Sequence, residues 1–186
     1  IFSIALDLGL TNLLTREVAN DKASANKYLG AALGAKLLLS VATILLLILV
    51  TGLAHYDPLV MTLIWVVVLS MLADSFTTLL FAFSRAFHNL KFESINAVLS
   101  QAVTLIVSLI VFKFNWGLAP LMWAQVASSV FAVVYAMTVI KRRWSLSLRP
   151  TWDLGYIKSL LLLALPFGLY AIAQRVYNYL DSVLLY

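Results

Sequence analysis

The stretch that decides the fold is LGAALGAKLLLSVATILLLILVTGL, residues 29–53, a run of almost entirely apolar side chains. A helix needs about 20 mainly apolar residues to cross a hydrocarbon core about 30 Å thick. The run is long enough for that, and it lacks the alternation of apolar and polar residues that is typical of the strands of a membrane barrel. The stretch therefore predicts a transmembrane helix.

The composition of the whole chain agrees with this interpretation. Of its 186 residues, 63% are hydrophobic and only 11% are charged, far from the balance of soluble proteins. Similar apolar runs recur along the chain, and we expect spans at residues 1–15, 29–53, 59–83, 95–112, 118–140 and 157–186. The first is short, and we expect it to be the end of a helix that begins before residue 1. The sequence thus predicts an all-α, polytopic transmembrane bundle of about six helices.

Basic residues between the spans predict the orientation. The loops at 16–28, 84–94 and 141–155 contain nine lysines and arginines, whereas AHYDP (residues 54–58) and KFNWG (residues 113–117) contain only Lys113. Because cytoplasmic loops are enriched in Lys and Arg, we expect the first three loops to be cytoplasmic and both chain ends to be outside. These loops also account for the net charge of +5, so no nucleic-acid partner is expected.

The stretch LDLGLTNLLTREVANDK, residues 6–22, places Asp7 and Gly9 inside an apolar segment. Arg16 and Glu17 are predicted to end this helix at the cytoplasmic surface. For Asp7 two interpretations stay open, a mid-membrane carboxylate or a residue near the start of a helix. Lys36 is expected to extend its long side chain to the cytoplasmic surface.

Small residues at spacing four predict close helix packing. Gly30 and Gly34 form a GxxxG pair that should admit a neighbouring helix. A second stripe of this kind comprises Ala124, Ser128, Ala132 and Ala136. In the last span, Pro166 and Gly168 are expected to kink or break the helix, because proline removes a backbone hydrogen bond.

Polar side chains form stripes on three of the predicted helices. The stripes comprise Ser70, Asp74, Thr77 and Thr78; Asn96, Ser100, Thr104 and Ser108; and Gln174, Tyr177, Asn178 and Asp181, with Arg175 beside the last. An unpaired polar group or charge in lipid is costly, so such stripes should face protein or water. They suggest a shared polar cavity, and hydrogen bonding between helices is the alternative.

Motifs for catalysis are absent from the sequence. It contains no Gly-rich phosphate loop, no paired loop carboxylates, no His-rich metal pattern and no Ser/His/Asp grouping. Without cysteine, it can form neither a disulfide nor a thiolate metal site. We therefore expect no catalytic residues, no metal and no cofactor, and the protein is not expected to be an enzyme.

Four segments resemble the polysaccharide flippases: DLGLTNLLTREVA, YLGAALGAKLLLS, FSRAFHNLKFES and LLLALPFGLYAIAQRVYNYLDSVLL. These O-antigen and teichuronic-type exporters belong to the multidrug/oligosaccharidyl-lipid/polysaccharide exporter superfamily, together with lipid II flippases and multidrug extruders. The resemblance implies about 12 or more helices in two lobes around a central cavity. Residues 1–155 would supply helices two to six of the first lobe, and residues 156–186 would supply helix seven, the start of the second.

The resemblance also implies a function. It indicates a multi-pass protein of the bacterial inner or plasma membrane that moves an undecaprenyl-diphosphate-linked oligosaccharide from the cytoplasmic to the outer leaflet for polysaccharide biosynthesis. Membrane lipid, this lipid-linked oligosaccharide and a proton or sodium ion would be its partners. A cation-coupled multidrug extruder of the same superfamily and a non-transporting membrane scaffold are the alternatives.

Site residues follow from the polar positions under this interpretation. The substrate-binding candidates are Gln174, Arg175, Tyr177 and Asn178. Arg175 leads this set because a guanidinium suits bidentate contact with phosphate oxygens. The alternative for Arg175 is a structural pair with a carboxylate such as Asp74 or Asp181. Those two aspartates are the ion-coupling candidates.

Overall fold

The computed structural model describes residues 6–54, 57–114 and 117–184, with side chains except at 54, 58–59, 118–119, 175–176 and 178–184. Over these ranges it contains helices and no strand. The helices are α2 (Leu10–Asn20), α3 (Ala25–Ala54), α4 (Pro58–Ala86), α5 (Lys91–Lys113), α6 (Leu118–Trp144) and α7 (Leu154–Leu184). Of these, α3 to α7 are long and apolar enough to cross a membrane, whereas α2 has 11 residues. The predicted all-α membrane bundle is confirmed.

Several helices are longer than the sequence predicted. Helix α2 continues through Arg16 and Glu17 to Asn20, so the prediction that these two charges end it is wrong. The Arg16 side chain is exposed and its Nε lies 3.8 Å from Glu17 Oε1, so both charges are accommodated on the helix surface. Helix α5 begins at Lys91, and Lys141, Arg142 and Arg143 lie in the last turn of α6.

The turn between α2 and α3 is held by Asp21. Its carboxylate accepts a hydrogen bond from the backbone N–H of Ala23 at 3.1 Å. The side chain of Ser24 also donates to it, and this bond is the main cause that lowers the pKa of Asp21. The chain reverses here because side-chain oxygens take up backbone N–H groups that the helix start leaves without partners.

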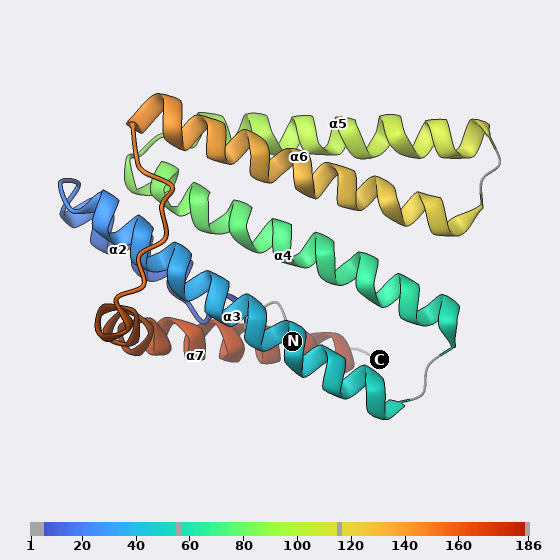
Figure 1. The fold of residues 1–186 in the computed structure, drawn as a ribbon, viewed down its shortest axis with the longest axis horizontal. Helices are drawn as coiled ribbons and strands as arrows, with labels where there is room; N and C mark the ends of the chain where they lie inside the picture. The colour runs from blue at the N-terminus through green and yellow to red at the C-terminus, as the bar shows by residue number, and fades with distance from the viewer. Residues whose placement is uncertain (1–5, 55–56, 115–116, 185–186) are drawn as a thin grey trace.

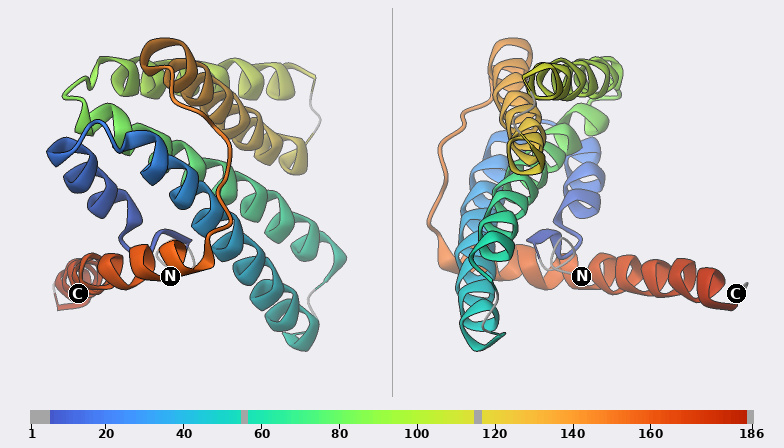
Figure 2. Two further views of the ribbon diagram at one scale, coloured as in Figure 1. Left: turned by 60° about the vertical axis from the view of Figure 1, so that its left-hand side comes forward. Right: turned by 90° about the vertical axis from the view of Figure 1, so that its right-hand side faces the viewer.

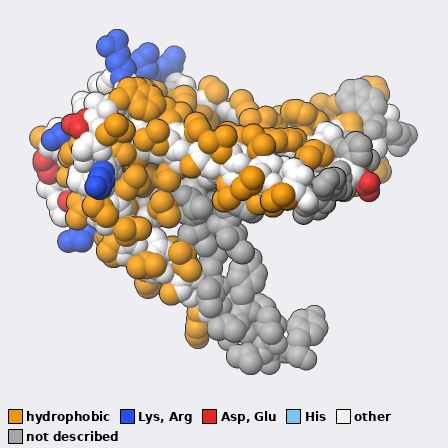
Figure 3. All heavy atoms as spheres, turned by 60° about the horizontal axis from the view of Figure 1, so that its bottom comes forward, with side chains coloured by type: hydrophobic (Ala, Val, Ile, Leu, Met, Phe, Trp, Pro, Cys, Tyr) orange, Lys and Arg blue, Asp and Glu red, His pale blue; other side chains and the backbone are white. Residues whose placement is uncertain are grey.

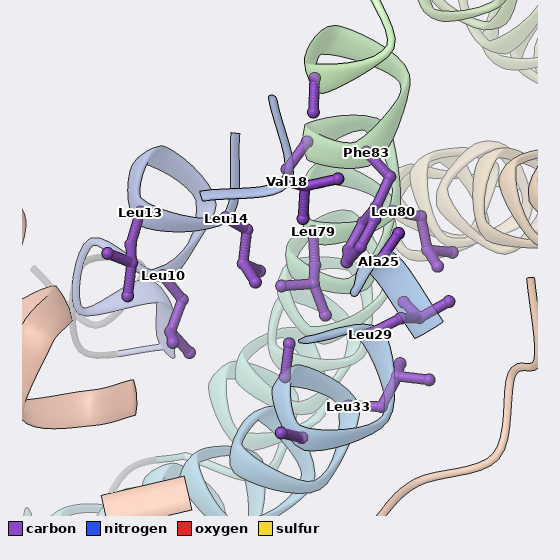
Figure 4. Packing of buried hydrophobic residues seen from close by; sticks show 14 of the residues in the cluster. Leu10, Leu13, Leu14, Val18, Ala25, Leu29, Leu33, Leu79, Leu80 and Phe83 are labelled. Atoms are coloured by element: carbon purple, nitrogen blue, oxygen red, sulfur yellow. The ribbon is translucent and has the colours of Figure 1, made fainter. Parts of the chain in front are cut away.

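Helix α4 is the centre of the bundle (Figure 1). It packs against α6, α2 and α3, while α5 packs mainly against α6 and α7 packs against α2 and α3. A cluster of buried apolar side chains joins α2, α3 and α4 (Figure 4) and extends to α6 and α7. Within it Leu14, Leu29 and Leu79 are fully buried. This cluster fixes α2 on the central helix.

The outer surface remains apolar along the helices (Figure 3). Leu53 is 75% exposed and Phe112 is 79% exposed. In water such a surface would be unfavourable, but lipid tails cover it at no cost. The exposed apolar surface therefore agrees with a bundle surrounded by lipid.

Charged residues gather at one end of the bundle. The turns after α2, α4 and α6 meet at the same end in Figure 1, and the visible Lys and Arg side chains gather there in Figure 3. Trp144 stacks on Phe87 at 5.5 Å between ring centroids and meets the edge of Phe92 at 5.8 Å. Basic and aromatic side chains together are typical of a membrane–water boundary. The arrangement supports the predicted orientation.

Helix α7 is continuous in its backbone but not straight. In Figure 1 its first part is seen end-on and its later part lies across the view, so the predicted kink takes the form of a bend. Pro166 lies inside the helix and cannot donate the backbone hydrogen bond at that turn. The later part of α7 extends away from the other helices (Figure 2).

Candidate functional site

A break in the chain before α2 shapes the site. Leu8 and Gly9 have φ angles of 42° and 78°, in the left-handed region, so the helical residues Leu6 and Asp7 are separated from α2. A Cβ on Gly9 would lie 2.4 Å from the backbone nitrogen of Gly168 in α7. Only glycine allows both this conformation and this close approach of two backbones. The break explains why an apolar segment contains Gly9.

Asp7, directly before the break, accepts two hydrogen bonds. Its Oδ1 receives one from Thr11 Oγ1 at 2.6 Å and one from Lys36 Nζ at 3.1 Å. The Lys36 side chain is 0% exposed and that of Asp7 is 30% exposed. The prediction that Lys36 reaches the cytoplasmic surface is therefore wrong. Lys36 lies on a buried face of α3, where a carboxylate from another segment is available as its partner.

A cavity of about 530 Å³ lies beside this pair. It is lined by Asp7, Gly9, Val67, Ser70, Met71, Asp74, Ser75, Thr78, Gln125 and Ala171. Its wall thus combines the residues before α2 with α4, α6 and α7. Among the described residues that line it, the charged ones are Asp7 and Asp74. The cavity is polar at its α4 wall, as the first predicted stripe requires.

Asp74 is the carboxylate on the α4 wall. At 1.5 Å per residue it lies about 18 Å from one end of α4 and about 24 Å from the other, near mid-membrane. Asp74 is exposed, and no described residue donates a hydrogen bond to its carboxylate. Ser70 and Thr78 line the cavity with it, whereas Thr77 is buried and donates to the backbone oxygen of Ala73. Asp74 therefore faces open space within the bundle.

The polar stripe on α5 has a different environment. Asn96 is buried, and Ser128 of α6 donates a 2.7 Å hydrogen bond to the backbone oxygen of Ser100. Thr104 donates to the same oxygen at 3.1 Å. None of the stripe lines the described cavity. The prediction of one cavity shared by all three stripes is wrong for α5, because α6 covers this face.

Small residues admit close neighbours, in one case of an unexpected kind. Ala124, Ser128, Ala132 and Ala136 are all buried on α6, as helix packing requires. Gly30 and Gly34 lie against the extended segment before α7, where Thr151 N–H donates to the Gly30 oxygen at 2.9 Å. The GxxxG pair thus admits an extended chain along both glycines, and a helix approaches only at Gly34, where Ile157 of α7 also lies close.

The candidates on α7 are only partly described. Gln174 is exposed and Tyr177 is 67% exposed, and neither lines the described cavity, to which α7 contributes Ala171. The side chains of Arg175, Asn178 and Asp181 lie outside the described residues. Their binding and coupling roles remain predictions.

An apolar groove adjoins the polar cavity. It has a volume of about 400 Å³ and runs between α3 and α4, lined by Leu47, Val50, Thr51, Val60, Leu63, Ile64, Val67, Val68 and Met71. Val67 and Met71 line both spaces. A molecule with a polar head and an apolar tail could therefore occupy the cavity and the groove together.

Three further polar residues of the sequence, Lys36, Gln125 and Ser75, belong to the site or adjoin it. Lys36 stands within an apolar span, and an ionisable residue at such a position is by default a functional candidate with a partner to be found. Gln125 is likewise a polar residue in the apolar span of α6, and Ser75 follows Asp74 directly. Which faces these residues share could not be known before the break at Leu8–Gly9 was seen.

Comparison with known proteins identifies the family. The family model described as polysaccharide biosynthesis protein matches residues 1–186. The chain belongs to this family. Family members are transporters of the flippase type in the multidrug/oligosaccharidyl-lipid/polysaccharide exporter superfamily, not enzymes. Neither a curated protein nor a solved structure matches the chain. Together with the five candidate spans among the described residues, the match makes this polysaccharide biosynthesis protein a multi-pass membrane protein.

Proposed function

We propose that the protein is a flippase that moves an undecaprenyl-diphosphate-linked oligosaccharide from the cytoplasmic to the outer leaflet. The observation that carries this proposal is the junction of the polar cavity and the apolar groove at Val67 and Met71. A lipid-linked sugar needs a polar path for its head group while its tail remains in an apolar environment. The family match supplies the link to polysaccharide biosynthesis.

The roles of individual residues extend this proposal. Ala171 lines the cavity, and a spacing of four places position 175 on the same face of a regular helix. We assign Arg175 to the diphosphate, with Gln174, Tyr177 and Asn178 as further substrate contacts. Asp74 and Asp181 are the proposed coupling residues for a proton or sodium ion.

The division into lobes is part of the same proposal. Residues 1–155 would form helices two to six of one lobe, and residues 156–186 would begin the second. The later part of α7 extends away from the other helices, which is the placement that a helix entering a second lobe requires (Figure 2).

Export of a glycan tests the proposal. The full-length protein would be expressed in bacteria that lack their own flippase for a lipid-linked oligosaccharide, and surface glycan and the lipid-linked intermediate would be measured. Arg175→Ala should abolish export at normal expression, and Arg175→Lys should restore it only in part. Arg143→Ala, at an exposed position in the last turn of α6, is the control and should export normally. Full export by the Arg175→Ala variant would contradict the substrate role.

A second candidate function is favoured by one observation. Two carboxylates, Asp7 and Asp74, line the described part of the cavity, and an acidic cavity suits a cationic substrate better than an anionic one. This favours a cation-coupled multidrug extruder. The same cells would be loaded with ethidium; ethidium efflux without any glycan export would replace the flippase by the extruder.

A further inference from the structure

Lys36 is a buried cation that the proposed function leaves without a task. Its side chain is 0% exposed, and among the described residues Asp7 is the carboxylate within ion-pair distance, at 3.1 Å. The backbone oxygen of Lys36 accepts a hydrogen bond from the Ser40 hydroxyl at 2.7 Å. An ammonium group can donate three hydrogen bonds, so one carboxylate oxygen leaves part of its capacity unused.

Asp7 stands between Lys36 and the cavity. The carboxylate lines the cavity and is 30% exposed, whereas Lys36 does not line it. Thr11 and Lys36 both donate to Oδ1, and no described residue donates to Oδ2. The pair is therefore asymmetric: one partner is sealed in protein and the other already reaches the open space.

Asp7 is also placed where it can change partners. It precedes the left-handed residues Leu8 and Gly9, so its backbone is not part of α2. A rotation of its side chain would turn the carboxylate wholly into the cavity, where water can solvate it. Lys36 would then have lost its carboxylate partner. It would need another anion, because an unpaired buried charge is strongly unfavourable.

A diphosphate is a suitable replacement for that carboxylate. It offers more acceptor oxygens and more negative charge than one carboxylate, and hydrogen bonds between two ionised groups are about twice as strong as neutral ones. The described part of the wall presents Asp7 and Asp74 and would repel an anion, so uncovering a cation beside them would favour anion binding. Lys36 is the described cation directly behind this wall.

We propose that Asp7 and Lys36 form an exchangeable ion pair, in which the phosphate oxygens of an anionic lipid head group replace the Asp7 carboxylate as the partner of Lys36. Lys36 keeps a counter-anion in both states, so no buried charge is left alone during the exchange. The lipid as the source of the diphosphate rests on the proposed function, but the exchange itself is a property of this pair.

Binding of defined diphosphates tests the exchange. The full-length protein would be placed in nanodiscs of zwitterionic lipid, and the Kd for geranylgeranyl diphosphate would be measured by calorimetry. Asp7→Asn keeps the size of the side chain but frees Lys36 from a competing charge, so we expect binding about tenfold tighter, the effect of about one charge-assisted hydrogen bond.

Asp74→Asn is the matched control. It removes one negative charge from the same cavity without releasing a cation, so its Kd should change much less than that of Asp7→Asn. An equal gain in the two variants would show general charge repulsion and would overturn the exchange. An unchanged Kd in Asp7→Asn would also overturn it, because a merely structural pair alters stability and not anion affinity.

A second variant keeps the test valid if single substitutions disturb folding. Asp7→Asn with Lys36→Met removes both charges together and should fold, yet it should lose the gain and bind more weakly than the natural protein. Retained tight binding in this double variant would contradict the role of Lys36.

Inorganic pyrophosphate separates the possible sources of the diphosphate. If it binds with the same dependence on Asp7 and Lys36, the exchange is supported for the diphosphate alone; if only geranylgeranyl diphosphate does, the exchange is supported for the lipid head group. Binding of neither probe to any variant would overturn it. If the natural protein shows this exchange in nanodiscs but exports no glycan in cells, the proposed function is refuted and the exchange is not.

Discussion

Helices α4 and α5 both present a stripe of polar residues at helical spacing, but the two stripes differ in what faces them. On α5, Ser100 accepts a hydrogen bond from Ser128, and α6 covers the stripe. On α4, Asp74 faces a cavity and no described residue donates to its carboxylate. The same sequence pattern therefore serves packing where a neighbouring helix covers it, and forms a site where the neighbouring segments leave a cavity.

The reason for the difference lies in the segments opposite α4. The break at Leu8–Gly9 and the bent helix α7 meet backbone to backbone at Gly9 and Gly168. Next to Asp74 they present Asp7 together with Gly9, which has no side chain, and Ala171, whose methyl group is small, and both leave space. The cavity beside α4 therefore depends on the close contact between Gly9 and Gly168, two residues far apart in the sequence.

The largest expected effect comes from closing that contact. Gly9→Ala places a methyl group 2.4 Å from the Gly168 nitrogen and forces alanine into a left-handed conformation. That conformation alone costs about 1–2 kcal/mol, and the overlap of backbones adds to it. We expect little folded protein, measured by size-exclusion chromatography and thermal unfolding in detergent.

Gly52→Ala is the matched control for this prediction. Among the described residues, no atom outside the adjoining turns of α3 lies within 4 Å of a Cβ added at Gly52. Alanine should therefore leave the Tm unchanged or raise it, by up to about 1 kcal/mol in stability. Equal stability of the two variants would show that the Gly9–Gly168 contact does not shape the α4 side of the bundle.

A smaller loss is expected from Lys36→Met. It leaves Asp7 without its cation, and breaking a buried pair costs about 3–5 kcal/mol, less here because Asp7 is partly exposed. Adding Asp7→Asn should recover most of the loss in Tm. Lys158→Met, at an exposed position on α7, should change the Tm hardly at all. If the Lys36→Met and Lys158→Met proteins have the same Tm, the Asp7–Lys36 ion pair does not stabilise this region.

Some of this comparison could be predicted from the sequence and some could not. Span number, helix class and the shared face of Ser70, Asp74 and Thr78 follow from apolar run length and helical period, which are local properties. The partner of Lys36 and the neighbour of Gly30 come from segments distant in the chain, so local patterns do not reveal them. The break at Leu8–Gly9 was not predicted either, because a glycine in an apolar run is equally compatible with close helix packing.

The polar stripes of α4 and α5 should differ in their importance for glycan export. Asp74→Asn keeps size and hydrogen bonding but removes the charge, and we expect export to fall at least tenfold, equivalent to about 1.4 kcal/mol. Thr104→Val on α5 should export normally, because its hydroxyl bonds only the Ser100 oxygen of its own helix. Glycan export would be measured across a range of pH and sodium concentration. Normal export by Asp74→Asn under all these conditions would refute its coupling role and leave it a packing residue.

The smallest effect is expected where α6 covers α5. Ser128→Ala removes the hydrogen bond to the Ser100 oxygen, and bonds of this kind between membrane helices average about 0.6 kcal/mol. Ser129 is the control, since it is also buried but its Oγ has no hydrogen-bond partner among the described residues. Ser129→Ala should therefore be neutral or slightly stabilising, because it removes a buried polar group that no bond compensates. The Tm of both variants would be measured in detergent. If Ser129→Ala lowers the Tm as much as Ser128→Ala does, the loss reflects packing volume on α6, and the hydrogen bond no longer distinguishes the covered stripe from the open one.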